Sequence, residues 1–148
     1  MAYCELRSVT IEATRGDKAG RVDFSLSGDG VTGERIACDK NQGMSKEDPH
    51  LFVFQLKAEP SLKLRFLKDP DSVMQIVSEG GVANQSHSNK ALGFDVVSVT
   101  DDVLVVSNLN DKKCDFKFTL NFVATAGGSA QIIPYDPIWG NGNGGNSR

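Results

Sequence analysis

The stretch "FDVVSVTDDVLVVSNLNDKKCDFKFTLNFVATAGGSAQII" (residues 94–133) alternates apolar and polar side chains over most of its length. A period of two is the signature of half-buried β-strands, whose successive side chains point to opposite faces of a sheet. The polar breaks "TDD", "NLNDKK" and "TAGGS" divide it into three or four strands. Such short connections join antiparallel neighbours, so the stretch predicts antiparallel hairpins within an all-β domain.

The same alternation recurs in the first half of the chain. In "RVDFSLS" (residues 21–27), Val22, Phe24 and Leu26 point one way, and "HLFVFQLKA" (residues 50–58) is apolar on both faces at its start, as in a central strand. No segment repeats apolar residues at helical spacing over a full helix length. We therefore expect an antiparallel β-sandwich of about eight or nine strands.

The expected domain covers residues 1–139 and has a single core. The final segment, "GNGNGGNSR" (residues 140–148), has no apolar residue to offset its ordering entropy, so we expect a disordered, flexible tail. The alternating positions predict the following apolar core: Leu6, Val9, Ile11, Val22, Phe24, Leu26, Phe52, Phe54, Leu62, Leu64, Phe66, Ile76, Val96, Val103, Val105, Phe116, Phe118, Leu120, Phe122 and Ile132.

Composition and charge narrow the classes of partner. Of 148 residues, 39% are hydrophobic and 24% are charged, as in ordinary globular domains. The net charge is −3 and the basic residues are scattered, so we expect neither a nucleic-acid partner nor binding to an anionic membrane. No apolar run approaches the roughly 20 residues that span a bilayer.

Cysteine usage and the N-terminus suggest a cytoplasmic protein. Cys4, Cys38 and Cys114 are odd in number, widely spaced and without a CxxC pair, so neither a disulfide framework nor a zinc site is indicated. The first twenty residues contain no apolar segment typical of an export signal. A chain that had lost such a leader would carry the same pattern.

Candidate catalytic groups are few. The chain has two histidines, His50 and His87, and no GxSxG turn that would activate a serine beside His87. Cys114 alternates with Phe116 and Phe118, which favours a core position over a reactive thiolate. We expect a protein that is not an enzyme, and a hydrolase using His87 or His50 is the disfavoured alternative.

Acidic clusters could in principle bind a hard cation. Asp69 and Asp71 flank a proline, and Asp101 and Asp102 are adjacent, but no dense DxDxDG loop is present. Aspartates also cap turns by accepting hydrogen bonds from nearby backbone. We expect that structural role, with no metal and no cofactor.

The segment "PYDPIW" (residues 134–139) contains one of the two tyrosines and the only tryptophan. Three roles are open for Tyr135, Asp136 and Trp139. We expect the rings to seal the end of the core, and the alternatives are that they anchor a protein interface or stack on a sugar whose hydroxyls bind the carboxylate. These three residues are the candidate site.

The run "DDVLVVSNLNDKKCDFKFTLNFV" followed by "IIPYDPIW" resembles small bacterial β-sandwich proteins of the DP-EP family. Glu59-Pro60 and Asp136-Pro137 match the dipeptides after which that family is named. The aromatic-Asp-Pro ending is also similar, more distantly, to bacterial inclusion-body and AidA-like proteins. The resemblance covers about the last third of the chain and implies a bacterial origin and a sandwich fold, with no activity to assign to residues.

Together these observations predict a non-enzymatic binding or self-associating β-sandwich. Open edge strands present unpaired backbone groups, so a homo-oligomer is one expected partner state. A protein or sugar partner is the other, and a lectin-like, carbohydrate-binding module using Tyr135, Asp136 and Trp139 is the alternative function.

Overall fold

The computed structural model describes residues 5–18, 21–37, 50–78, 93–108, 114–125 and 128–141. These residues form strands and one 3₁₀ turn, Pro60–Leu62, and contain no α-helix. No helix in the described ranges is long and apolar enough to cross a membrane. The strands are β1 (Glu5–Arg15), β2 (Val22–Gly28), β3 (Val31–Thr32), β4 (Arg35–Ala37), β5 (His50–Ala58), β6 (Leu64–Phe66), β7 (Met74–Ser78), β8 (Phe94–Val99), β9 (Val103–Asn108), β10 (Cys114–Ala124), β11 (Gln131–Tyr135) and β12 (Ile138–Asn141).

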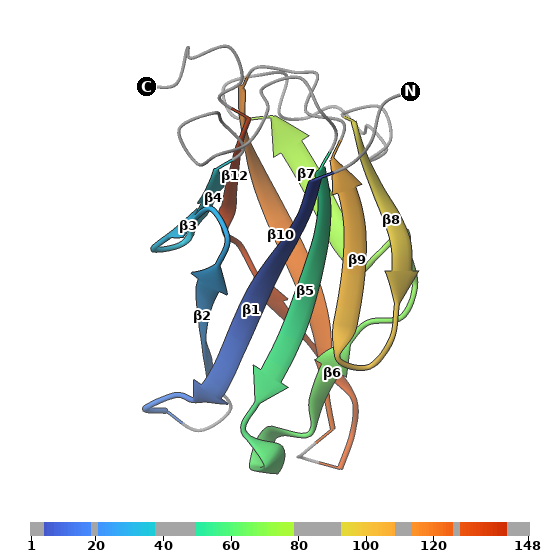
Figure 1. Ribbon diagram of the computed structural model, residues 1–148. Coiled ribbons are helices and arrows are strands. Elements are labelled where there is room, and N and C mark those ends of the chain that lie inside the picture. Colours follow the sequence, from blue (N-terminus) through green and yellow to red (C-terminus); the bar gives the residue numbers. More distant parts are fainter. Residues whose placement is uncertain are drawn as a thin grey trace.

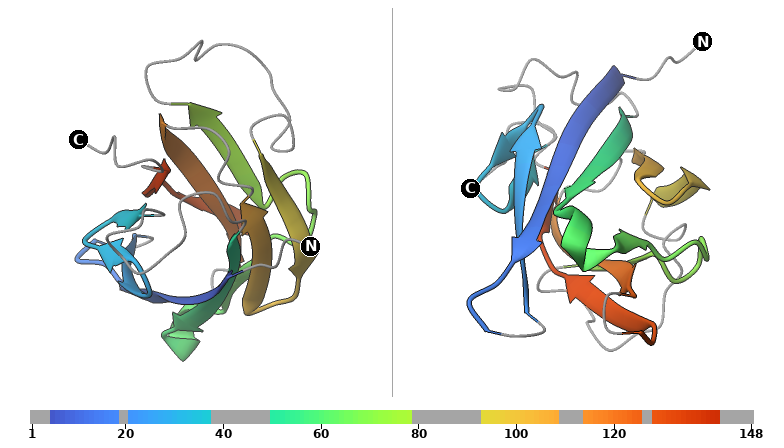
Figure 2. Two further views of the ribbon diagram at one scale, coloured as in Figure 1. Left: turned by 45° about the horizontal axis from the view of Figure 1, so that its top comes forward. Right: turned by 90° about the horizontal axis from the view of Figure 1, so that it is seen from below.

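The strands form two sheets that pack face to face, so the all-β sandwich is confirmed (Figures 1 and 2). Sheet A has the order β2-β1-β5-β9-β8, which places the doubly apolar strand β5 in its centre, as expected. Sheet B has the order β11-β10-β12-β4-β3, and the long strand β10 also pairs with β6 and β7 on its other edge.

Two features of the predicted architecture were wrong. Twelve strands are described instead of eight or nine, because β3, β4, β6 and β12 span only two to four residues, too few for alternation to reveal. The sheets are also mixed, since β1 pairs with β5 and β4 pairs with β12 in parallel. A period of two is the same in parallel and antiparallel strands, so it cannot distinguish the two.

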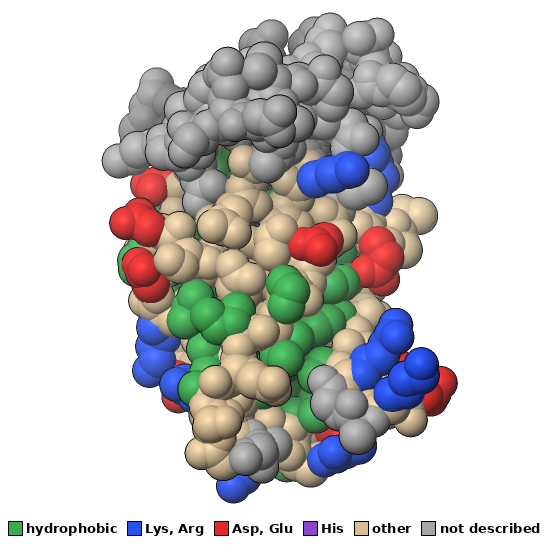
Figure 3. All heavy atoms as spheres, turned by 180° about the vertical axis from the view of Figure 1, so that it is seen from behind, with side chains coloured by type: hydrophobic (Ala, Val, Ile, Leu, Met, Phe, Trp, Pro, Cys, Tyr) green, Lys and Arg blue, Asp and Glu red, His purple; other side chains and the backbone are tan. Residues whose placement is uncertain are grey.

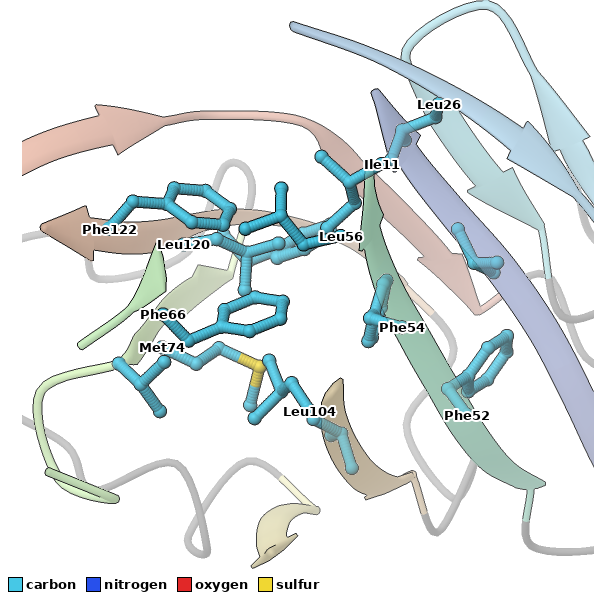
Figure 4. Packing of buried hydrophobic residues seen from close by; sticks show 14 of the residues in the cluster. Ile11, Leu26, Phe52, Phe54, Leu56, Phe66, Met74, Leu104, Leu120 and Phe122 are labelled. Carbon is cyan, nitrogen blue, oxygen red and sulfur yellow. The ribbon is translucent and has the colours of Figure 1, made fainter. Parts of the chain in front are cut away.

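The core lies between the inner faces of the two sheets (Figure 4). Phe52 and Phe54 of β5 and Leu104 of β9 come from sheet A, and Phe66 and Phe122 come from sheet B. All five side chains have no exposed surface. Burying residues of this size contributes roughly 1.5–3 kcal/mol each, which makes this layer the main source of stability.

Most of the expected core is buried or packed against it, but four positions are corrected. Leu6 and Ile132 are 64% and 60% exposed. Val103 and Val105 lie half-buried on the outer face of sheet A, and the core instead receives Leu104 and Val106. Strand β9 begins with four consecutive apolar residues, so its sequence does not specify which alternate set points inward. The side chain of Phe116 lies outside the described part.

The Glu59-Pro60 dipeptide has a structural role at one end of sheet A. The Glu59 N–H donates to the Ala13 carbonyl at 2.9 Å. Its carboxylate accepts hydrogen bonds from the Arg15 N–H at 3.2 Å and the Ser61 hydroxyl at 3.1 Å. Pro60 then begins the 3₁₀ turn, since its fixed φ and missing N–H suit that position. This corner ties β1 to the chain that leaves β5.

Strand β12 extends to Asn141, so the described fold continues two residues past Trp139. Residues 142–148, which make up most of the predicted tail, lie outside the described residues, as do Cys4, Cys38 and His87.

Candidate functional site

Tyr135 lies in a stack of aromatic rings between the two sheets. Its ring packs on Phe24 of β2, with centroids 4.7 Å apart and an interplanar angle of 16°. Phe24 stacks in turn on Phe122 of β10 at 5.1 Å, and Phe122 stacks on Phe66 of β6 at 4.9 Å. These four residues, here called the aromatic seam, join the edge strand of sheet A to three strands of sheet B; Figure 4 shows the Phe66 and Phe122 rings.

The Tyr135 hydroxyl is engaged as well. It donates a hydrogen bond to Glu34, which lies in the turn between β3 and β4. Burial, followed by this hydrogen bond and the negative charge of Glu34, raises the pKa of Tyr135 far above its ordinary value. The hydroxyl is therefore a neutral donor that fastens the end of β11 to a neighbouring turn.

Asp136 lies on the outer face of sheet B, the face opposite to the aromatic seam. Its carboxylate accepts a hydrogen bond of 2.6 Å from the Thr119 hydroxyl, and Thr119 alternates with the buried residues Phe118 and Leu120. The Pro137 carbonyl accepts from the Phe118 N–H at 3.2 Å. Because Asp136 and Pro137 lie between β11 and β12, which both pair with β10, the dipeptide redirects the chain within sheet B.

The three predicted site residues are thus placed separately. Tyr135 belongs to the aromatic seam, while Asp136 is exposed beside Thr119 on the outer face of sheet B. The Trp139 backbone pairs with Phe116 of β10 and Ile36 of β4, and its side chain lies outside the described part. The core-sealing role of Trp139 stays a prediction.

The other candidate residues named from the sequence also lie at separate places in the fold. His50 is completely buried at the start of β5, where it contacts the Phe52 ring and pairs across the strands with the buried Asn108. Asp69 caps a turn, accepting hydrogen bonds from the Asp71 N–H at 3.1 Å and the Ser72 hydroxyl at 3.0 Å. No cluster of three or more His, Cys, Asp or Glu suited to a metal occurs within the described ranges.

A second surface, which sequence analysis did not single out, lies on the outer face of sheet A. It crosses four adjacent strands, β1, β5, β9 and β8, which stand side by side at the front of Figure 1. The register places Leu6 opposite Leu51 and Val53 opposite Val105. This apolar strip consists of Leu6, Leu51, Val53, Val97, Val103 and Val105.

The strip is exposed and its centre carries no charge. Leu6 and Val97 are 64% and 56% exposed, and the other four members are partly exposed. Val97 is the extra residue of a β-bulge in β8, which turns it outward. Single exposed apolar residues are ordinary, but a contiguous patch of them is typical of an interaction surface.

Uncharged residues fill the spaces around the strip. Ser8 lies beside Val53, and Ser107 lies beside Leu51. Charges begin only at the ends of the strands, with Asp95 at one end and Glu12 and Lys57 at the other. The strip is therefore an apolar centre with a polar border, which is the composition of a protein interface.

The outer face of sheet B differs. Apolar side chains also gather on it in Figure 3. In the strand register Val123 pairs with Ile132, which is 60% exposed. Polar side chains interrupt that patch, since Asn121 of β10 donates from its amide to the Ser72 carbonyl at 2.7 Å, and Asp136 projects beside Thr119. Among the described residues, sheet A alone presents an apolar surface across four strands.

No protein-family model matches this chain, and no curated protein matches it either. The resemblance to the DP-EP family stays a prediction. The candidate site is consequently defined by geometry, through the exposure and register of the six residues in the strip.

Proposed function

We propose that this protein is a non-enzymatic, self-associating β-sandwich that binds a second copy through the outer face of sheet A. The observation that carries the proposal is the apolar strip itself. Six apolar side chains from four neighbouring strands are contiguous, and the two at its ends are more than half exposed.

The size of the face is that of a small interface. The strip crosses β1, β5, β9 and β8, which have 11, 9, 6 and 6 residues. With strand spacings of about 4.8 Å and rises of about 3.3 Å, these four strands have a footprint of about 500 Å². Weak protein interfaces bury less than about 600 Å² on each partner, and the strip falls in that class. The same face of a second copy would cover the whole strip.

The alternative functions have less support. A carbohydrate site at Tyr135 and Asp136 would use a hydroxyl that already binds Glu34 and a carboxylate that already accepts from Thr119. A hydrolase using His50 would have to reach a side chain with no exposed surface. Neither alternative has an observation comparable to the strip.

Sedimentation equilibrium of the wild type and two variants tests the proposal. The wild-type chain, with a mass of 15.9 kDa, should show a rising average mass as its concentration increases. Val53→Lys places a charge in the centre of the strip and should leave a monomer. Ile132→Lys is the matched control, because Ile132 is as exposed as Leu6 but lies on sheet B, and it should associate like wild type.

A wild-type chain that stays monomeric at every concentration would contradict the proposal. Equal loss of association in Val53→Lys and Ile132→Lys would contradict the choice of surface. Thermal unfolding of both variants confirms that each is folded.

A further inference from the structure

We infer that the β-bulge at Val97 prevents strand β8 from pairing with the β8 strand of a second copy of this chain, so that the hydrogen-bonded ladder of sheet A ends at β8. The bulge protects the edge of the sheet, which is a separate surface from the apolar strip on its outer face. It acts in this way whether or not the strip binds a second copy.

Strand β8 (Phe94–Val99) is an edge strand of sheet A. It pairs with β9 on one side, and no strand in the described ranges pairs with its other side. The opposite edge of the sheet differs, because β2 leads through a tight turn into β3 of sheet B and the two strands contact each other (Figure 1). Among the described strands of sheet A, β8 thus offers the backbone N–H and C=O groups that another chain could pair with.

The sequence of β8 is typical of a strand that pairs readily. It reads "FDVVSV", with four apolar residues of high β-propensity and no proline or glycine. Two such strands in antiparallel register would join two five-stranded sheets into one. The one charged residue, Asp95, lies near the start of the strand, so composition alone leaves the middle of this edge unprotected.

The bulge lies in that middle segment. Val96 pairs with Val106 and Ser98 pairs with Val105, so Val97 is an extra residue with no position opposite to it on β9. An extra residue of this kind bends the strand and increases its local twist. The outward N–H and C=O groups of β8 then lose the regular spacing that a second strand needs, which is how bulges protect sheet edges.

The core does not require the extra residue. On β9, the buried side chains occupy every second position of residues 104–108, as in a regular strand. On β8, Phe94 and Val96 are also spaced by two, but Val99, which packs against the same core, follows Val96 by three. Without Val97 every inward residue of β8 would be spaced by two. A chain one residue shorter would therefore fit the same core and have a regular edge.

Deletion of Val97 in the Val53→Lys background tests the edge alone. Val53→Lys removes association through the strip, so this chain should be a monomer. The deletion makes β8 regular, and we expect sedimentation equilibrium at high concentration to give twice the monomer mass. Val97→Ala in the same background is the matched control, because it shortens the side chain but keeps the number of residues and the bulge, and it should stay monomeric.

Hydrogen exchange locates the new contact. Every second N–H of an antiparallel edge strand points away from the sheet. In the deletion variant, these outward N–H groups of β8 should exchange at least about tenfold more slowly at high than at low protein concentration. In the wild type, the outward N–H groups of β8 should gain no protection as the concentration rises.

A deletion variant that stays monomeric, or that associates without protection of the β8 amides, would overturn the inference. A deletion variant that is unfolded by far-UV circular dichroism would also overturn it, because the bulge would then be a requirement of the fold. Concentration-dependent protection of the outward β8 amides in the wild type would contradict it as well. A wild type that stays monomeric would instead remove the proposed function, and the deletion would still test the edge.

Discussion

The aromatic seam and the apolar strip are both apolar regions of the sandwich, but only the seam is covered by its own chain. In the seam, Tyr135, Phe24 and Phe122 stack on one another, and the Tyr135 hydroxyl donates to Glu34. In the strip, Leu6 and Val97 remain more than half exposed. The aromatic residues of the seam thus pack within the chain, while the valines and leucines of the strip form an exposed apolar surface.

The two regions should therefore respond differently to substitution. Changes in the seam remove contacts within one chain and should lower the free energy of unfolding. Changes in the strip remove contacts between chains and should weaken association with little effect on the isolated fold.

The largest effect is expected for Phe122→Ala. Phe122 has no exposed surface and stacks on both Phe24 and Phe66, so the change should lower the free energy of unfolding by about 3–5 kcal/mol. Denaturant titration at low protein concentration measures this value. A loss below about 1 kcal/mol would show that the seam does not hold the sheets together.

Val105→Glu should weaken association and leave the free energy of unfolding almost unchanged. It places a carboxylate in the centre of the strip, and we expect the dimer dissociation constant to rise about a hundredfold, or about 2.7 kcal/mol. The free energy of unfolding of the monomer should change by less than about 1 kcal/mol, because Val105 is only half-buried. Sedimentation and denaturant titration give the two values, and a large loss of monomer stability without loss of association would break the comparison.

Tyr135→Phe should have the smallest effect. It removes the hydrogen bond to Glu34 from a half-buried hydroxyl, and we expect a loss of about 1 kcal/mol after allowing for solvent screening. Because the pKa of Tyr135 in the folded chain is raised above its unfolded value, the stability linked to this group is fully present below about pH 10 and is lost as the pH rises further.

Urea titrations of wild type and Tyr135→Phe at pH 8 and at about pH 11 measure this difference. Wild type should lose more stability over that interval than Tyr135→Phe does. Equal losses would mean that the Tyr135 hydroxyl is not held in its neutral form by the fold.

The sequence predicted the fold class and much of the core, because alternation in β2 and β10 has a clear phase. Phe24 and Phe118 both point inward as expected, with Phe24 partly buried. The parallel pairing of β1 with β5 could not be predicted, since it depends on contacts between residues 45 positions apart that no local pattern records.

The candidate surface was partly visible in the same pattern. The sequence of β5 is apolar on both faces, and β9 begins with four apolar residues. In a two-layer sandwich, only one face of a strand packs against the core. One set of apolar side chains on each of these strands must therefore face outward, unless another layer covers it. That signal could have identified Val53 and Val105. The contribution of Leu6 and Val97 depends on register and on a β-bulge, and these emerge only in the folded chain.

Methyl NMR spectra over a dilution series test most directly whether the outer face of sheet A is the interface. Between low and high concentration, the methyl signals of Leu6, Val53 and Val97 should shift and become protected from a soluble paramagnetic agent. The Ile132 methyls, equally exposed on sheet B, should stay unchanged. Concentration-independent strip methyls, or changes centred on Ile132, would contradict the account.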